Sequence, residues 1–224
     1  MHLAVFGATG PSGQCVIEEA LRRNYTITIF ARTPSKLPES ITSSPSVTII
    51  KGTLSDKEAI SKALDGADAV LSTLGPSLGV GTALKYHGTP ITDGYRLILS
   101  EMAAHGIKRL IALGTVSNKT DEDGPSIIRW GMVSAVWLFL HSAWRDVVEF
   151  GKAIAASDGI EWTIARVAKL TNGEGGNVSA GFVGKGGTGT FLARQDLGKW
   201  YIDELESPKW IHQMPVVYSK SAVR

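Results

Sequence analysis

Three glycines near the start of the chain, Gly7, Gly10 and Gly13, stand at intervals of three residues. They follow a short apolar run, 3–6, that is typical of a buried strand, and they open a segment, 11–23, with the periodicity of a helix. A strand that turns through glycines into a helix directs backbone N–H groups and the positive end of the helix dipole toward one point. Such a point binds anions, and the pyrophosphate of a dinucleotide suits it well.

The three glycines have different expected roles. Gly7 allows the tight turn, Gly10 lets a phosphate approach the backbone, and Gly13 lets the helix and the strand pack closely. A glycine triplet by itself is a weak signal, so the competing interpretation is a strand-to-helix turn that binds no ligand.

The residues between the glycines favour the same site. Thr9 and Ser12 add hydroxyl donors beside the expected phosphates. Pro11 suits the first helical position, where the missing N–H would have no partner within the helix. The segment is therefore interpreted as a dinucleotide site.

The end of the second predicted strand, 26–31, decides between the two nicotinamide cofactors. An Asp or Glu there would accept hydrogen bonds from the ribose 2′-hydroxyl of NAD. This chain has Arg32 and Lys36 instead, with Thr33 and Ser35 between them. Cations and hydroxyls suit a dianionic 2′-phosphate, so the sequence predicts NADP(H), with a solvated basic loop as the alternative.

The ends of the next strands nearest the expected cofactor carry small and polar residues. Small side chains would let a flat cofactor lie across the sheet edge, and hydroxyls could bond to a ribose or a substrate oxygen. The competing interpretation is helix caps and turn residues. The residues are Ser72, Thr73 and Gly75 after the fourth strand, and Gly114, Thr115 and Ser117 after the fifth.

A Tyr-x-x-x-Lys pair, which ordinary short-chain dehydrogenases use as a proton relay, is absent from the sequence. Lys169 follows the sixth predicted strand and is the expected replacement. It would act as an electrostatic anchor or, if desolvated, as a proton donor. A solvated surface lysine is the other interpretation.

Other chemistries have little support. The five histidines show no metal-ligand spacing, so no metal site is predicted. Asp121, Glu122 and Asp123 form an acidic loop that is expected to cap the following helix rather than to bind a cation. No G-x-S-x-G segment supports a hydrolase.

These residues need a scaffold of alternating strands and helices. That alternation predicts one α/β domain, 1–224, with a doubly wound parallel sheet, and a C-terminal part, about 166–224, that contributes to substrate binding. Residues 172–190 are glycine-rich and predict a loop with one or two short strands. Strands are predicted at 3–6, 26–31, 46–50, 67–73, 109–113, 162–165 and, as a final edge strand, 215–218. Helices are predicted at 11–23, 56–64, 92–105 and 195–206, with a further helix that ends near residue 157. A long loop is predicted at 75–88.

Composition limits the class of partner. The chain has 224 residues, 43% hydrophobic and 20% charged, with a formal net charge of +2. This charge is too small to favour nucleic acid or an anionic membrane. The uncharged run 130–144 is shorter than the roughly 20 residues that span a bilayer as a helix. Because the first strand begins at residue 3, no signal peptide is expected and a cytoplasmic location is predicted.

The uncharged run 130–144 contains three of the six tryptophans. One interpretation is a buried helix beneath a flanking loop. The other is the wall of an apolar pocket or a subunit interface, because the aromatic content exceeds what helix burial needs.

Five segments in this order resemble the atypical short-chain dehydrogenase/reductases: GATGPSG, ARTPSKL, GADAVLSTLG, HGIKRLIALGT and DGIEWTIAR. The resemblance is to the NAD(P)H-binding, NmrA-like group, nearest the biliverdin-IXβ reductase/flavin reductase type. It implies a single Rossmann domain that binds NADP(H). It also implies roles by position: Gly7, Thr9, Gly10, Ser12 and Gly13 for the pyrophosphate, Arg32 and Lys36 for the 2′-phosphate, Leu74 and Gly75 for the adenosine side, and Thr115 and Lys169 for the nicotinamide. The cofactor set is completed by Pro11, Thr53, Leu54, Thr73, Gly114 and Val167.

The chain departs from the family pattern at three positions. Thr53 stands where an Asp is common, Arg166-Val167 stands where Arg-Pro is usual, and Lys169 stands where the flavin reductase type has a histidine. With the tryptophan-rich segment, these differences indicate a small apolar or aromatic substrate in place of a tetrapyrrole or flavin.

The predicted function is an NADPH-dependent oxidoreductase that transfers a hydride to an apolar carbonyl, enone or flavin-like acceptor. Lys169 and Thr115 would polarise the acceptor, and water or Lys169 would give the proton. Two alternatives stay open: a nucleotide-sensing regulator without turnover, and a non-redox isomerase or cyclase that uses the same cleft. A monomer or a homodimer is expected, with no nucleic-acid or membrane partner.

Overall fold

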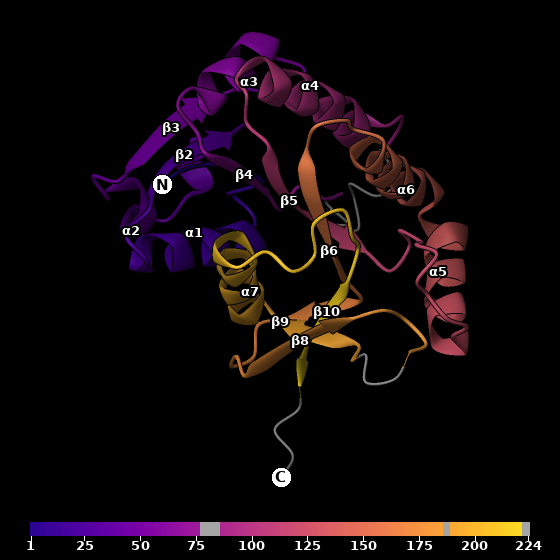
Figure 1. Cartoon of the computed structure of the whole chain (residues 1–224). Coiled ribbons are helices and arrows are strands. Elements are labelled where there is room, and N and C mark those ends of the chain that lie inside the picture. The colour runs from indigo at the N-terminus through magenta and orange to yellow at the C-terminus, as the bar shows by residue number, and fades with distance from the viewer. Residues whose placement is uncertain (77–85, 186–188, 221–224) are drawn as a thin grey trace.

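The computed structural model describes residues 1–76, 86–185 and 189–220. In this part of the chain, eight strands form one sheet in the order β3-β2-β1-β4-β5-β6-β10-β8 (Figure 1). Two further strands, β7 and β9, form a small parallel pair. The strands are β1 His2–Phe6, β2 Thr26–Ala31, β3 Val47–Lys51, β4 Ala69–Ser72, β5 Arg109–Thr115, β6 Glu161–Val167, β7 Lys169–Thr171, β8 Asn177–Gly181, β9 Phe191–Ala193 and β10 Val216–Lys220.

The first six strands of the sheet are parallel, so their carboxyl ends lie along one edge. Phe6 at the end of β1 is in register with Phe30 of β2 and with Ser72 of β4. On the far side of β4, Thr115 of β5 is in register with Val167 of β6. The register therefore brings the segments after β1, β2, β4, β5 and β6 to the same edge of the sheet.

Helices cover both faces of the sheet, because its strands are apolar on both sides. One layer, with α1 and α7, packs on a core that includes Val16, Ile17 and Leu197; the other, with α3, α4 and α6, packs on a core that includes Ile98 and Phe150 (Figure 1). The helices are α1 Pro11–Arg22, α2 Glu39–Thr42, α3 Lys57–Leu64, α4 Pro90–Ala104, α5 Ile127–Phe139, α6 His141–Ala155 and α7 Arg194–Glu206, with a short 3₁₀ turn, η1, at Pro34–Lys36.

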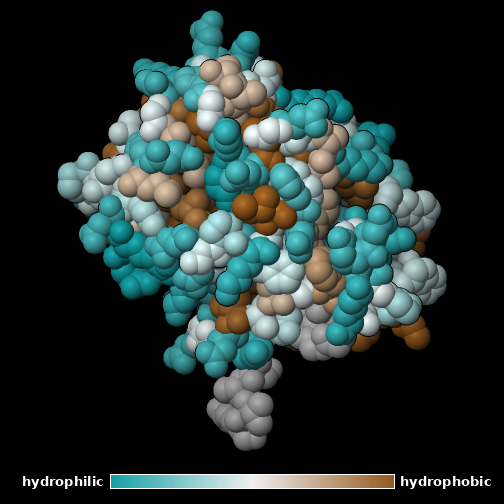
Figure 2. Space-filling model, in the orientation of Figure 1, coloured by the Kyte–Doolittle hydropathy of each residue, from teal (hydrophilic) through white to brown (hydrophobic). Residues whose placement is uncertain are grey.

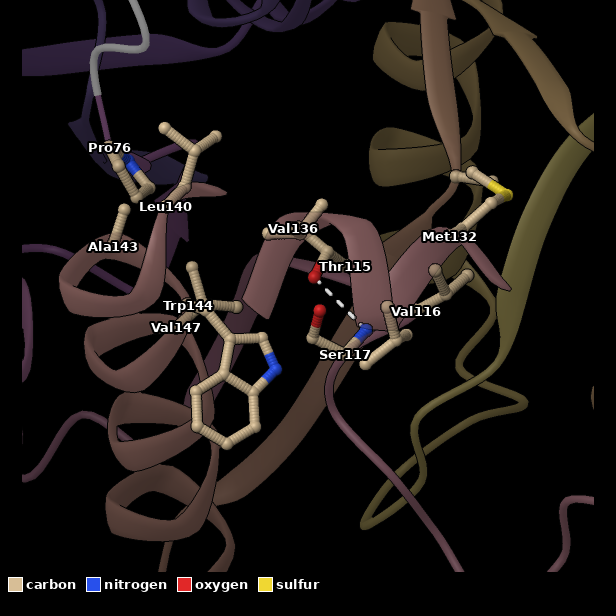
Figure 3. Close-up of a pocket in the computed structure, with 12 residues that line it drawn as sticks. Pro76, Thr115, Val116, Ser117, Met132, Val136, Leu140, Ala143, Trp144 and Val147 are labelled. Carbon is tan, nitrogen blue, oxygen red and sulfur yellow. Dashed lines mark hydrogen bonds between the residues drawn. The ribbon is translucent and has the colours of Figure 1, made fainter. Parts of the chain in front are cut away.

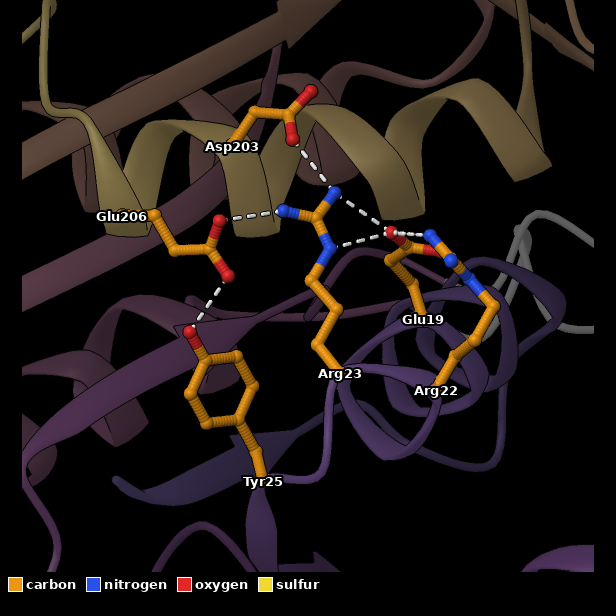
Figure 4. A network of polar contacts seen from close by, with 6 residues as sticks. All are labelled: Glu19, Arg22, Arg23, Tyr25, Asp203 and Glu206. Carbon is orange, nitrogen blue, oxygen red and sulfur yellow. Dashed lines mark hydrogen bonds and ion pairs between the residues drawn. The ribbon is translucent and has the colours of Figure 1, made fainter.

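The two helices of the first layer are joined by an ionic cluster at the C-terminal end of α1 (Figure 4). The Arg23 guanidinium donates to Glu19 at 2.7 Å, to Asp203 at 2.6 Å and to Glu206 at 2.7 Å, and the Tyr25 hydroxyl donates to Glu206 at 2.7 Å. The shared carboxylates raise the pKa of Arg23, although its burial opposes this. Because the glycine turn is at the other end of α1, this cluster fixes the helix without occupying its N-terminus.

The predicted doubly wound α/β domain is confirmed, and so are the short strands expected within 172–190, where β8 lies. The edge position predicted for 215–218 is wrong: β10 lies between β6, to which it is parallel, and β8, to which it is antiparallel. The sequence PVVY fits an interior strand because Val216 and Val217 are 2% and 1% exposed. Most of the loop predicted at 75–88 lies outside the described residues.

No helix in residues 1–76, 86–185 and 189–220 is long and apolar enough to cross a membrane.

Candidate cofactor and substrate site

The glycine turn has the tight geometry that its sequence predicts. Gly7 has a φ of +82°, and a Cβ added there would lie 2.7 Å from the carbonyl carbon and Oγ1 of Thr73. A Cβ on Gly13 would lie 2.5 Å from the Gly7 carbonyl oxygen. Both positions therefore require glycine: Gly7 for its backbone conformation and its approach to the end of β4, and Gly13 for the approach of α1 to the turn.

Gly10 differs from the other two glycines because its Cβ position is open. Leaving out its chain neighbours, the nearest described atom would be the Gly7 carbonyl oxygen, at an ordinary 3.5 Å. Gly10 is also the N-cap of α1, and no side chain caps this end. Ser12 and Gly13 lie in the first turn, where backbone N–H groups have no carbonyl partner within the helix. The helix therefore begins in a cradle that a phosphate can enter.

The other predicted cofactor residues around this edge differ in their surroundings, and Thr73 is the one that contacts the cradle. The Thr73 hydroxyl donates to the Gly7 carbonyl at 3.2 Å, which ties the end of β4 to the turn. Leu54 packs against Gly94 of α4, where an added Cβ would meet its side chain at 2.8 Å. Thr53 pairs with Ser55 at 3.0 Å between the two hydroxyl oxygens. Leu74 is partly buried beside the core of the second layer, and no described atom lies within 4 Å of an added Cβ at Gly75.

Ser72 is not available to a ligand, contrary to the interpretation that its hydroxyl faces the cofactor. Its side chain is fully buried, and its hydroxyl oxygen lies 2.6 Å from the Tyr95 hydroxyl oxygen. The Tyr201 hydroxyl donates to the Ser72 carbonyl at 3.1 Å. Tyrosines from both helical layers therefore fix the end of β4, and the hydroxyl serves the fold.

The basic pair lies where the second strand leaves the sheet. Arg32 follows β2 directly, and Lys36 ends η1; both side chains are exposed. Within the described ranges, neither forms an ion pair with a carboxylate. Because β1 and β2 are in register at Phe6 and Phe30, both cations leave the sheet at the edge where the glycine turn begins. They are placed to meet a further anionic group.

An apolar pocket of about 180 Å³ lies beyond the end of β5 (Figure 3). Helices α5 and α6 form most of its wall, and the loop after β5 supplies its polar hydroxyls. The lining residues are Pro76, Thr115, Val116, Ser117, Met132, Val133, Val136, Leu140, Ala143, Trp144, Val147 and Ala168. Of the segment 166–224, Ala168 is the residue that lines it.

The side chain of Asn118 fixes the loop that carries Thr115 through two hydrogen bonds. The side-chain carbonyl oxygen of Asn118 accepts from the Thr115 N–H at 3.0 Å, and the side-chain NH₂ of Asn118 donates to the Val147 carbonyl at 2.8 Å. Gly114 makes room for this side chain, because an added Cβ would lie 2.8 Å from its Oδ1. The Thr115 hydroxyl oxygen accepts from the Ser117 N–H at 3.1 Å, which leaves its own O–H to donate to a ligand. The loop therefore offers a positioned hydroxyl to the pocket.

A buried ion pair behind this loop was missed by sequence reasoning. Arg166 of β6 is fully buried and donates two hydrogen bonds to Asp123, at 2.6 and 2.8 Å. Burial raises the pKa of Asp123, but the Arg166 guanidinium and the Val183 N–H outweigh it, so the pKa lies below the ordinary value. An arginine flanked by the apolar residues Ala165 and Val167 within a strand is the signal that could have indicated a buried carboxylate partner.

The prediction that the acidic loop caps the following helix, α5, is therefore wrong. Ser126 caps this helix, with its hydroxyl accepting from the Arg129 N–H at 3.2 Å. Asp123 instead binds Arg166, which pulls the loop onto β6. Within the three described ranges, no group of His, Cys, Asp and Glu could hold a metal ion.

Lys169 lies just past the pocket, next to the lining residue Ala168. Its side chain is exposed, and its ammonium nitrogen stands 5.4 Å from the centroid of the Phe191 ring. Val167, in register with Thr115, is 6% exposed and packs in the core under α7. The structure thus brings Thr115 to the pocket, whereas Lys169 follows the lining residue Ala168 and its ammonium lies over the Phe191 ring, outside the lining.

The tryptophan-rich stretch forms α5 and the start of α6, and the interpretation of a buried helix is wrong. No residue of α5 is buried, and Ile127 and Phe139 are 88% and 78% exposed. One side of the helix lines the pocket through Met132, Val133 and Val136, as the pocket-wall interpretation predicts. In Figure 2, hydrophobic side chains protrude over α5 at the right edge of the molecule. Whether a second subunit contacts this face stays a prediction.

Comparison with known proteins agrees with this geometry. A curated relative, the reductase pytE of Aspergillus terreus, is 26% identical over 91% of this chain and 90% of its own length. A short-chain dehydrogenase/reductase of Veillonella parvula, solved in complex with NADP, superposes with a TM-score of 0.77 at 17% identity over 100% of this chain and 96% of its own. ChuY, an anaerobillin reductase of Escherichia coli O157:H7, superposes with a TM-score of 0.73 at 16% identity over the whole of both chains.

A family model described as NAD(P)H-binding matches residues 7–208, from the first glycine of the turn to the loop after α7. The match covers both the anion cradle and the pocket, and the Rossmann-like fold agrees with it. The chain belongs to the NAD(P)H-binding family.

Proposed function

We propose that this protein is an NADPH-dependent reductase that acts on an apolar carbonyl, enone or flavin-like acceptor. The observation that carries the proposal is the open Cβ position at Gly10, in a turn where Gly7 and Gly13 are tightly packed. Space is left at the position where a pyrophosphate would approach the backbone. The apolar pocket beyond β5, at the same edge of the sheet, would then take the acceptor.

The residues present fit NADPH. The N–H groups at the start of α1, with the hydroxyls of Thr9 and Ser12, would hold the pyrophosphate, and Arg32 and Lys36 would hold the 2′-phosphate. Leu74 and Gly75 would lie on the adenosine side, while Gly114 and Val167 would border the nicotinamide. When bound, NADPH supplies the hydride, and the protein supplies position and surroundings.

The pocket residues would orient the acceptor. The apolar walls from α5 and α6 exclude water, which strengthens hydrogen bonds made inside. The Thr115 hydroxyl would donate to the acceptor oxygen, and Lys169 at the pocket border would add positive charge. Reduction of a carbonyl needs one proton at that oxygen, which Lys169 or a water molecule would give.

Within the family, the five segments of the sequence resemblance favour the NmrA-like group, nearest the biliverdin-IXβ reductase/flavin reductase type. The reductases among the relatives support a reduction. The exposed face of α5 is where a homodimer would form if the protein is not a monomer. A cytoplasmic location is consistent with a freely diffusing cofactor and substrate.

The test is NADPH consumption by the purified protein with a panel of quinones, flavins, enones and ketones. We expect oxidation of NADPH at 340 nm with at least one acceptor class, and faster oxidation than with NADH. Binding of NADPH without turnover of any acceptor would contradict the proposal and favour a nucleotide-sensing regulator. Product formation without cofactor would favour an isomerase or cyclase.

Replacing Arg32 with alanine is expected to weaken NADPH binding by about 10- to 100-fold, as for loss of a hydrogen bond to a charged group. Binding of NADH, which lacks the 2′-phosphate, should change little. Calorimetric titration of both cofactors measures the difference. Lys62→Ala, which removes an exposed cation on α3, is the matched control and should leave both affinities unchanged. Equal weakening of NADH and NADPH by Arg32→Ala would contradict the assignment.

A further inference from the structure

One buried polar atom at the pocket has no hydrogen-bond partner among the described residues. The indole nitrogen of Trp144 is buried, and within residues 1–76, 86–185 and 189–220 no group accepts its hydrogen. Buried tryptophan N–H groups normally find an acceptor, since an unmade bond leaves the group desolvated without compensation. The wall of the pocket therefore contains a donor whose acceptor is not supplied by the described chain.

The indole ring is held in place by its neighbours. Trp144 lies in the first turn of α6, and its ring stacks on His141 at a centroid distance of 5.6 Å and an interplanar angle of 30°. The Trp137 ring, from α5, packs edge-on against the His141 ring at a centroid distance of 5.6 Å. In Figure 3 the indole nitrogen faces the side of the pocket formed by Thr115 and Ser117. A donor fixed in this way can select the position of a ligand atom.

The rest of the wall limits what that ligand is. Thr115 and Ser117 supply the other side-chain polar groups among the lining residues, and every remaining side chain is apolar. An indole N–H only donates, so the partner must accept. The pocket thus matches an apolar body that carries an oxygen with free lone pairs.

We propose that Trp144 is the hydrogen-bond donor that binds the carbonyl oxygen of the acceptor, with Thr115 as the second donor. The acceptor is then a compact aromatic or alicyclic ketone, enone or quinone, and a hydrocarbon of the same shape is bound less well. This inference rests on the proposed function for calling the ligand an acceptor, but the pairing itself needs no cofactor.

The test compares 1-tetralone with tetralin, two bicyclic compounds of closely similar shape that differ in one carbonyl group. Binding is measured by calorimetry on the whole chain without cofactor. The wild-type protein should bind tetralone more tightly than tetralin. Trp144→Phe should weaken tetralone binding by about 10-fold, the loss typical of one buried hydrogen bond, and should change tetralin binding by less than about two-fold. Trp130→Phe, on the neighbouring helix α5, 72% exposed and absent from the lining, is the matched control and should alter neither.

A second measurement uses the unmodified protein. The chain has six tryptophans, so an amide-type ¹H–¹⁵N spectrum contains six indole N–H signals, and loss of one in Trp144→Phe assigns it. Tetralone should move the Trp144 signal downfield, as a new hydrogen bond does, whereas tetralin should not. Equal weakening of both compounds, an unmoved Trp144 signal, or no binding of tetralone to the wild type would each overturn the inference. If tetralone binds as expected but NADPH is never oxidised, the proposed function fails and the donor role of Trp144 stands.

Discussion

Replacing Gly10 with valine is expected to reduce the affinity for both NADPH and NADH by about 100-fold or more, equivalent to losing two hydrogen bonds to phosphate. The added carbon would occupy the open side of the turn, where the nearest described atom is 3.5 Å away, and would meet the incoming phosphate. Because nothing in the protein is displaced, the melting temperature should stay within a few degrees of the wild type. Calorimetric titration and thermal unfolding together measure the two properties.

Gly13 and Gly173 are the controls for this prediction. Gly13→Val should destabilise the fold itself, because its Cβ would lie 2.5 Å from the Gly7 carbonyl oxygen. Gly173→Val lies in a loop where an added Cβ meets no described atom within 4 Å, and it should affect neither stability nor binding. A Gly10→Val protein that is folded and binds both cofactors normally would rule out a pyrophosphate at this turn.

Removing the carboxylate of Asp123 is expected to have the largest effect on stability. Asp123→Ala leaves the fully buried Arg166 guanidinium without its counter-charge, and breaking such a pair costs about 3–5 kcal/mol. Urea unfolding should show this loss. Asp123→Leu combined with Arg166→Met removes both charges and should recover most of it. A single variant as stable as the wild type would show that the pair contributes little.

The same pair predicts how stability depends on pH. The folded pKa of Asp123 lies below its ordinary value, so its stabilising contribution is present above the unfolded pKa, about 4, and is lost as the pH falls through the folded value. The difference in unfolding free energy between wild type and Asp123→Ala should therefore be constant at neutral pH and shrink in acid. A difference that grew as the pH fell would contradict this assignment.

The fold was predictable from the sequence because its signals are local. The apolar run 3–6 followed by spaced glycines determines the first strand, turn and helix, and the β-branched segment 26–31 determines the second strand. The position of β10 was not predictable in this way: PVVY indicates a strand, but its neighbours, β6 and β8, are set by long-range pairing.

In the candidate site, too, the features encoded by one short stretch of sequence were predictable, and those that depend on long-range packing were not. The glycine turn that begins at Gly7 and the basic segment after β2 are each one continuous stretch of sequence. The placement of each could therefore be predicted. Ser72 could not be distinguished from a free hydroxyl, because its partners Tyr95 and Tyr201 come from distant helices. The pairing of Asp123 with Arg166, and the lack of an acceptor for the Trp144 nitrogen among the described residues, likewise appear only when separate elements are packed together.

The interior position of β10 has a consequence for biosynthesis. During translation, β6 and β8 emerge before residues 216–220, and each presents unpaired backbone N–H and C=O groups on the side that β10 later fills. This half of the sheet can therefore close only after residues 216–220 have left the ribosome. Arg166 is in register with Val216 across that seam, so the strand that carries the buried partner of Asp123 gains its second neighbour only then.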